Sequence, residues 1–184
     1  GTPVPSSLAD QWIIRELTGA SQQVEALLAD YRFSEAADTV YHTIWSSLAD
    51  WYVEAAKQQN NPDMLAWALD AALRLAHPFA PFVTETIWQT LPWYEKGSML
   101  IASSWPEPVA YDEIAAGEFE QLQKLVNEIR FVSAELPGNK RYKVVYHNDS
   151  LIDDNKELIR QLARLQGLET TDQPAGLQLA TPAL

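Results

Sequence analysis

Residues 77–82 read His-Pro-Phe-Ala-Pro-Phe, and this stretch decides how the first half of the chain folds. A proline disfavours helical backbone at the residue that precedes it. We therefore expect one helix to end just before Pro78 and another to begin at Pro81, with a sharp corner between them. The two rings of this corner, Phe79 and Phe82, are apolar and are expected to be buried.

Three longer helices are predicted before the corner, because apolar residues recur there at steps of three and four. Ser6 or Ser7 is expected to cap the first helix, Ser34 the second, and Asn61 the third, with Pro62 in its first turn. The expected apolar faces are Ile13, Leu17, Ala20, Val24, Leu27 and Tyr31; then Ala37, Val40, Tyr41, Ile44, Leu48, Trp51 and Ala55, widened by Trp45 and Tyr52; then Leu65, Ala68, Leu69, Ala72, Leu73 and Ala76. With a short fourth helix after the corner, these segments indicate an antiparallel helical bundle.

The pattern changes in the second half of the chain. The expected elements are a small strand or extended segment at Met99–Ala102, a fifth helix from Asp112 to about Leu136, a strand at Tyr142–His147, a helix from about Asp153 to Leu168 and a short strand at Leu177–Ala180. We therefore predict a mainly α fold with a small C-terminal α/β appendage. Residues 1–92 would form the four-helix core, 93–111 a connector, and 112–184 the fifth helix and appendage, all in one continuous folded unit.

Composition limits the functions that the chain can have. It contains no Cys, which excludes disulfides and zinc sites that need sulfur. No glycine-rich phosphate loop or His-Glu-x-x-His pattern occurs, so we expect no catalytic residue, cofactor or metal within the chain. His77 is expected to satisfy a carbonyl at a helix end.

The charge of the chain is strongly acidic but unevenly distributed. With 13 basic and 25 acidic residues, the net charge is −12, which is unfavourable for binding a polyanion. The segment 124–164 is different, since it holds 8 basic and 6 acidic residues. Any contact with phosphate is therefore expected late in the chain.

Trp12 is the most informative aromatic residue, because it lies off the apolar face of the first helix, on a side continued by Glu16, Gly19 and Gln23. Unpaired RNA bases stack on exposed rings of this kind, at about 1–3 kcal/mol per base. The alternative is that Trp12 packs against the next element at the end of the bundle. The sequence favours neither interpretation.

The candidate phosphate contacts are arginines and lysines. Arg15 follows Trp12 by three residues, nearly one helical turn, and could contact a phosphate or pair with a neighbouring glutamate. Arg130, Lys140, Arg141 and Lys143 form the one compact positive cluster that the sequence offers. Such a cluster is the usual electrostatic signature of a nucleic-acid interface.

Several segments together resemble the anticodon-binding domain of valyl-tRNA synthetases, which are class I aminoacyl-tRNA synthetases. They are Asp10–Leu17, Tyr31–Ala37, Tyr41–Lys57, Trp105-Pro106, Ile129-Arg130 and, most specifically, His77–Gln89. The resemblance covers about residues 5–168. It departs from the family pattern at Gln11 and Ser133, where the family usually has arginine, and these two positions put individual RNA contacts in doubt.

The resemblance implies that the chain docks the anticodon stem-loop of a valine-accepting tRNA. Our hypothesis places Trp12 on an unpaired base and Arg15, Arg130, Lys140 and Arg141 near the RNA backbone. The parent would be a cytoplasmic valine-tRNA ligase that uses ATP in a catalytic domain absent from these residues. The chain itself would then be no enzyme, and its partners would be tRNA and the remaining domains, with no membrane.

Two alternatives stay open at this point. The first is the corresponding domain of an isoleucyl-, leucyl- or methionyl-tRNA synthetase, since these enzymes share the proline corner in looser form. The second is a helical protein-interaction module without any role in RNA binding, which the net charge of −12 favours.

Overall fold

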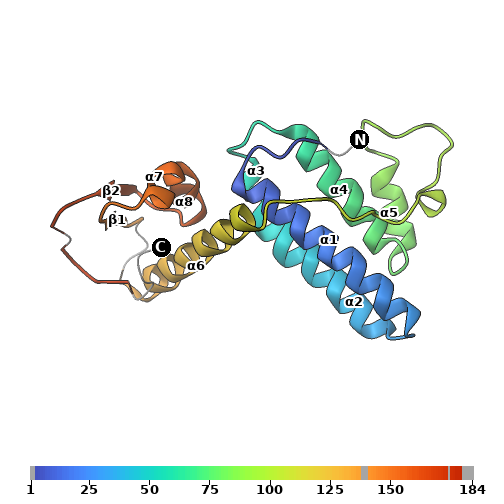
Figure 1. Ribbon diagram of the computed structural model, residues 1–184, viewed down its shortest axis with the longest axis horizontal. Coiled ribbons are helices and arrows are strands. Elements are labelled where there is room, and N and C mark those ends of the chain that lie inside the picture. Colours follow the sequence, from blue (N-terminus) through green and yellow to red (C-terminus); the bar gives the residue numbers. More distant parts are fainter. Residues whose placement is uncertain (1–2, 138–140, 174, 180–184) are drawn as a thin grey trace. The chain divides into compact units, whose positions relative to one another are not determined.

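The computed structural model describes residues 3–137, 141–173 and 175–179 (Figure 1). The chain forms two compact units, Gly1–Ala116 and Gly117–Leu184, and the boundary falls inside helix α6 (Glu113–Glu135). The predicted mainly helical fold with a small α/β part is confirmed, whereas the division at residues 92 and 111 stays a prediction. Among the described residues, no helix is both long and apolar enough to cross a membrane.

The first unit is a helical bundle (Figure 1). Its elements are α1 (Leu8–Ala29), α2 (Phe33–His42), the π-helix η1 (Thr43–Tyr52), α3 (Val53–Ala56), α4 (Pro62–Ala76), α5 (Pro81–Trp88) and the 3-10 helix η2 (Leu100–Ala102). Helix α1 packs against α2, η1 and α4, and α4 packs against α5. The predicted face of the first helix is buried except for Tyr31, which lies beyond the end of α1 and is 81% exposed.

The predicted helix ends are mostly confirmed. Ser7 and Asn61 cap α1 and α4 with their side chains. The proline corner also forms as expected, since α4 is capped at His77 and α5 begins at Pro81. The assignment of Ser34 as a cap was wrong, because α2 begins at Phe33 with Arg32 at the N-cap position, so that Ser34 already lies inside the helix.

The inner face of the second predicted helix is confirmed in part, since Val40, Leu48 and Ala55 are buried as expected. Its buried residues are Ala36, Val40, Thr43, Leu48, Tyr52 and Ala55. The step of five residues from Thr43 to Leu48 matches the wider hydrogen-bonding pattern of the π-helix η1. Tyr52 is fully buried as predicted, whereas Tyr41 and Trp45 are 58% and 59% exposed, so their placement in the core was wrong.

The outer face of α5 also differs from expectation. Thr84 and Trp88, one turn apart, are the buried residues of this helix. Phe82 therefore points away from the bundle and is 89% exposed, so the prediction that it is buried was wrong. Val83 and Ile87 lie on the same outer face, with 55% and 40% exposed.

His77 reaches a carbonyl only through a hydroxyl group. The hydroxyl of Thr84 donates to the carbonyl of Ala80 at 2.8 Å, and the His77 Nδ1 atom lies 2.8 Å from the same hydroxyl oxygen. Because a hydroxyl has one proton to donate, Nδ1 is the donor to Thr84. The predicted direct bond from the ring to a helix-end carbonyl was therefore wrong.

The segment Met99–Ala102 is a 3-10 turn rather than the expected extended segment. The amide of Leu100 donates to Glu85 Oε2 at 2.8 Å. The Leu100 side chain is 2% exposed and joins Leu73 and Trp88 in a small cluster. This tertiary contact, which the sequence does not reveal, explains why the segment turns inward.

The second unit contains the rest of α6 and a β-α-β arrangement. Strands β1 (Lys143–Tyr146) and β2 (Gly167–Thr170) pair in parallel, with Lys143 opposite Gly167. Helices α7 (Ser150–Asp154) and α8 (Lys156–Leu162) connect them, and α8 packs against β2. The predicted strand at residues 142–147 and the fifth helix are confirmed.

The single helix predicted from about Asp153 to Leu168 was wrong. The helical geometry breaks at Asn155, and α8 ends at Leu162, so that residues 167–170 become β2. The expected strand at 177–180 does not form at residues 177–179, and Ala180 lies outside the described residues.

Candidate nucleic-acid interface

Trp12 is part of the interior, as in the second of the two interpretations that the sequence left open, and this contradicts the hypothesis that places it on an unpaired base. Its side chain is only 4% exposed. The first half of α1 buries residues on nearly every side, including Ala9, Ile13, Ile14 and Leu17. Because neighbouring elements enclose the indole, a base has no face of Trp12 to stack on.

Asp10 is a fully buried carboxylate at the start of α1. Its Oδ1 atom accepts a hydrogen bond from the Tyr52 hydroxyl at 2.7 Å. Its Oδ2 atom accepts from the Ser6 amide at 2.9 Å, the Ser6 hydroxyl at 3.1 Å and Asn61 Nδ2 at 3.2 Å. The carboxylate thus ties together the start of α1, the end of η1 and the cap of α4, which is a structural role.

Tyr52 is expected to make the stability of the folded chain depend on pH in the alkaline range. Burial of the phenol, together with its hydrogen bond to Asp10, raises the pKa of Tyr52 well above its ordinary value. In the unfolded chain the phenol ionises near a pH of about 10, whereas the folded chain keeps it protonated. Its stabilising effect is therefore complete below that pH and is lost as the pH rises further, at about 1.4 kcal/mol per pH unit.

Urea unfolding on either side of the ordinary tyrosine pKa tests this prediction. The free energy of unfolding should fall more steeply with rising pH in the wild-type chain than in Tyr52→Phe, which has no phenol to ionise at this position. The other tyrosines are shared by both proteins and serve as the internal control. Equal slopes would show that the Tyr52 pKa is not raised by folding.

Arg15 lies on α1 with its charge already compensated. Its Nη1 atom is 3.3 Å from Glu113 Oε1, and its Nη2 atom is 3.5 Å from Glu16 Oε1. The side chain is 16% exposed. Of the two roles that the sequence allowed, the structure shows the pairing with glutamate.

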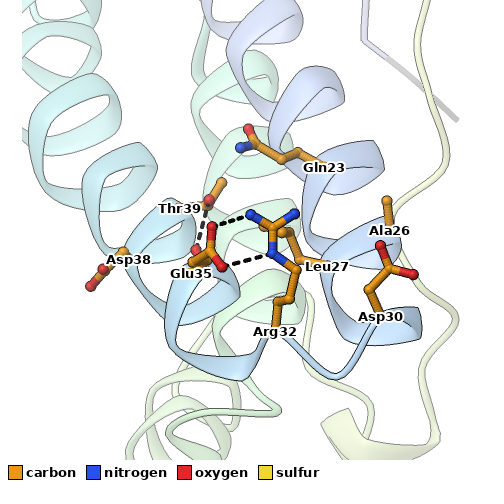
Figure 2. Close-up of a pocket in the computed structure, with 8 residues that line it drawn as sticks. All are labelled: Gln23, Ala26, Leu27, Asp30, Arg32, Glu35, Asp38 and Thr39. Atoms are coloured by element: carbon orange, nitrogen blue, oxygen red, sulfur yellow. Dashed lines mark hydrogen bonds and ion pairs between the residues drawn. The ribbon is translucent and has the colours of Figure 1, made fainter.

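A groove of about 430 Å³ between α1 and α2 has an acidic lining (Figure 2). Arg32 Nε donates to Glu35 Oε1 at 2.7 Å, and a second contact joins the same two side chains. Asp30 and Asp38 also line the groove. Three carboxylates against one guanidinium make this groove unsuitable for a phosphate group.

The second unit gathers arginines around the turn that follows α8. Arg130, on α6, donates from Nε to the carbonyl of Leu162 at 2.9 Å. Arg141 precedes Tyr142, whose carbonyl accepts the amide of Gln166 at 2.8 Å. The structure therefore brings Arg130 and Arg141, which the sequence predicted together, to the same end of the β-α-β arrangement.

The predicted cluster also includes two lysines. Lys140 lies outside the described residues. Lys143 forms an ion pair with Glu169 on the neighbouring strand. Arg141 is exposed and forms no ion pair with any residue that the structure describes.

Arg164 is a cation that sequence reasoning missed. Its φ of 54° lies in the left-handed region that favours glycine. Its amide donates to the Gln161 carbonyl at 3.1 Å, and the Leu165 amide donates to the Arg160 carbonyl at 2.9 Å, which is the Schellman pattern that ends a helix. An arginine in this conformation costs about 1 kcal/mol relative to glycine. The turn was not predicted, because the sequence was read as one helix that continued to Leu168.

Two exposed aromatic residues, Tyr41 on α2 and Trp45 on η1, lie next to each other. The rings of Tyr41 and Trp45 stack on each other, with centroids 6.3 Å apart and an interplanar angle of 3°. Sequence reasoning assigned both to the core, because they fit an α-helical stripe. Their exposure and mutual stacking make them a pair of rings that a base could reach.

The sequence of the chain is similar to those of known tRNA ligases. A family model described as the anticodon-binding domain of tRNA ligase matches residues 10–144. The valine–tRNA ligase of Petrotoga mobilis is 34% identical over 185 residues, which cover 90% of this chain and 21% of that protein. The valine–tRNA ligase of Mycobacterium leprae is 37% identical over 172 residues, covering 89% and 17% respectively. That of Thermotoga maritima is 35% identical over 168 residues, covering 85% and 19%. The chain thus spans about a fifth of the length of these curated relatives.

Proposed function

The chain belongs to the family of anticodon-binding domains of tRNA ligases, and on this premise we propose that it binds the anticodon stem-loop of a valine-accepting tRNA. The carrying observation is that relatives named valine–tRNA ligase align with 85–90% of it. The proposed parent attaches valine to tRNA with ATP, in the cytoplasm and in domains outside this chain. In this proposal the chain has no catalytic activity or cofactor of its own, and its partners are tRNA and those domains.

The distribution of charge favours the second unit for contact with phosphates. Residues 1–116 hold 5 basic and 15 acidic residues, whereas residues 117–184 hold 8 basic and 10 acidic. The proposed backbone contacts are Arg130, Lys140 and Arg141, with Lys140 proposed on its sequence position alone. Trp12 and Arg15 are assigned to the fold, because one is buried and the other is paired with two carboxylates.

For the unpaired bases we propose Tyr41 and Trp45 as the stacking residues. Base stacking needs an accessible ring face, and these two side chains are 58% and 59% exposed. Stacking is tolerant of base identity, since every base has a π face. The discrimination of one anticodon from another is therefore not assigned to these two rings.

Salt dependence of tRNA binding tests the proposed backbone contacts. We expect a valine tRNA transcript to bind at low salt, with a log–log slope of about −0.9 for each phosphate contact. The double variant Arg130→Gln, Arg141→Gln should make the slope less steep by about 2. The matched control is Arg32→Gln, which removes a charge from the acidic groove of the first unit. A wild-type chain that binds no tRNA at low salt would overturn the proposed function.

A second candidate function is docking of a protein partner, and the outer face of α5 favours it. Phe82, Val83 and Ile87 expose 89%, 55% and 40% of their surface on one side of this helix. An apolar face without charged residues is unsuited to RNA and typical of a protein contact. Failure of tRNA binding, with self-association or partner binding abolished by Phe82→Ser, would support this candidate.

A further inference from the structure

We propose that Arg164 binds a phosphate of the RNA backbone, together with Arg130 and Arg141. Nothing in the sequence pattern marks Arg164 as a site residue, and the assignment comes from its conformation and surroundings. It rests on the proposed function, because it names a further contact for the same RNA. The surface formed by these three arginines is called the arginine cluster below.

The backbone of Arg164 is in a left-handed conformation that is unfavourable for an arginine. With a φ of 54°, it occupies the position after a helix at which glycine is the favoured residue. An arginine there destabilises the turn, yet its side chain is exposed and so adds little packing in return. Strained residues of this kind concentrate at binding sites, where the side chain is needed for another purpose.

The charge around Arg164 is the second argument. Arg160, on the preceding turn of α8, pairs with Glu157 at 2.6 Å, so its charge is compensated within the helix. Arg164 forms no ion pair with any described residue, and the same holds for Arg141. Arg164, on the turn after α8, and Arg141, just before β1, therefore present guanidinium groups whose charge is available to an external anion.

The geometry of the turn is the third argument. Arg130 donates to the carbonyl of Leu162, two residues before Arg164, and this bond holds the turn against α6. The Gln166 amide donates to the carbonyl of Tyr142, the neighbour of Arg141. Three arginines from different elements thus surround one short segment of the second unit.

The chemistry of the arginine cluster fits a phosphodiester rather than a base. A guanidinium group offers a planar fork of donors that matches two phosphate oxygens. Contacts of this kind position RNA without reading its sequence. We therefore expect Arg164 to contribute equally to the binding of different tRNAs.

The test uses Arg164→Gly in the complete 184-residue chain, because stability and binding should then change in opposite directions. Glycine relieves the backbone strain, so the melting temperature should stay equal or rise. The dissociation constant for a valine tRNA transcript should increase about threefold to tenfold, and the log–log salt slope should become less steep by about 0.9. Arg164→Lys, which keeps the charge but lacks the guanidinium fork, should restore the salt slope and only part of the affinity.

The matched control is Arg160→Gln, which removes the same charge from a paired and exposed position on the same helix. It should change tRNA affinity by less than Arg164→Gln does. If the wild-type chain binds tRNA and Arg164→Gly binds equally well with the same salt slope, the inference about Arg164 is wrong while the proposed function stands. If the wild-type chain binds no tRNA at low salt, the proposed function itself fails.

Discussion

Replacing Trp12 by alanine is expected to lower the free energy of unfolding by about 3–4 kcal/mol. The indole is 4% exposed, so its removal forfeits buried apolar surface and leaves a cavity that the helices around α1 cannot close completely. Urea unfolding followed by far-UV circular dichroism measures the change. Any loss of tRNA binding by this variant would follow from the loss of structure.

The variant Trp12→Phe separates packing from base stacking. Phenylalanine keeps an aromatic ring but fills less volume, so we expect a smaller loss of about 1–2 kcal/mol and unchanged tRNA affinity. Trp45→Ala is the matched control, because it removes an equal ring that is 59% exposed, and it should alter stability by about 0.5 kcal/mol or less. A stable Trp12→Phe protein with tenfold weaker tRNA binding would restore Trp12 as a stacking residue.

Features that depend on a few neighbouring residues could be predicted from the sequence. The cap at Ser7, the cap at Asn61 and the helix boundaries at His77 and Pro81 follow from side-chain and proline chemistry within one turn of helix. These local effects do not depend on what the helix later packs against. They are the reason that the helical bundle and its corner were predicted correctly.

Which face of a helix is buried could not be predicted as well, because that depends on neighbours distant in sequence. Trp12 lies off one apolar stripe, yet it is buried by packing on another side of α1. Trp45 was assigned to the widened stripe, yet it is 59% exposed, whereas Thr43, which the predicted stripe did not include, is buried in the π-helix η1. Phe82 was predicted to be buried, yet it lies on the outer side of α5, which no other described element of the first unit covers, and is 89% exposed.

Only part of the candidate site could be predicted, because the conformation of Arg164 depends on contacts between segments that are distant in sequence. Arg130 and Arg141 stand out as a charge cluster in the sequence, and the fold brings them to one end of the second unit. Arg164 has no such signal, since its interest lies in a left-handed conformation that sequence patterns associate with glycine. The parallel pairing of β1 with β2, which fixes the end of α8, joins segments more than twenty residues apart.

The buried carboxylate of Asp10 is expected to contribute strongly to the stability of the bundle. Asp10→Ala should lower the free energy of unfolding by about 3 kcal/mol, because it leaves the buried Tyr52 hydroxyl without its acceptor and removes the bond from the Ser6 amide. Asn61 also loses a partner, which weakens the start of α4. Urea unfolding with far-UV circular dichroism provides the measurement.

Two further variants decide whether the loss comes from the hydrogen bonds of Asp10. Asp10→Asn keeps the shape and one acceptor oxygen but places an amide donor against the groups that donate to the carboxylate, so it should cost about 1–2 kcal/mol or more. Asp38→Ala, at an exposed position on α2, should change stability by about 0.5 kcal/mol or less. Equal stability of Asp10→Ala and Asp38→Ala would contradict the structural role of Asp10. A loss confined to the Asp10 variants would show that this carboxylate fixes the meeting point of α1, η1 and α4 on which the bundle depends.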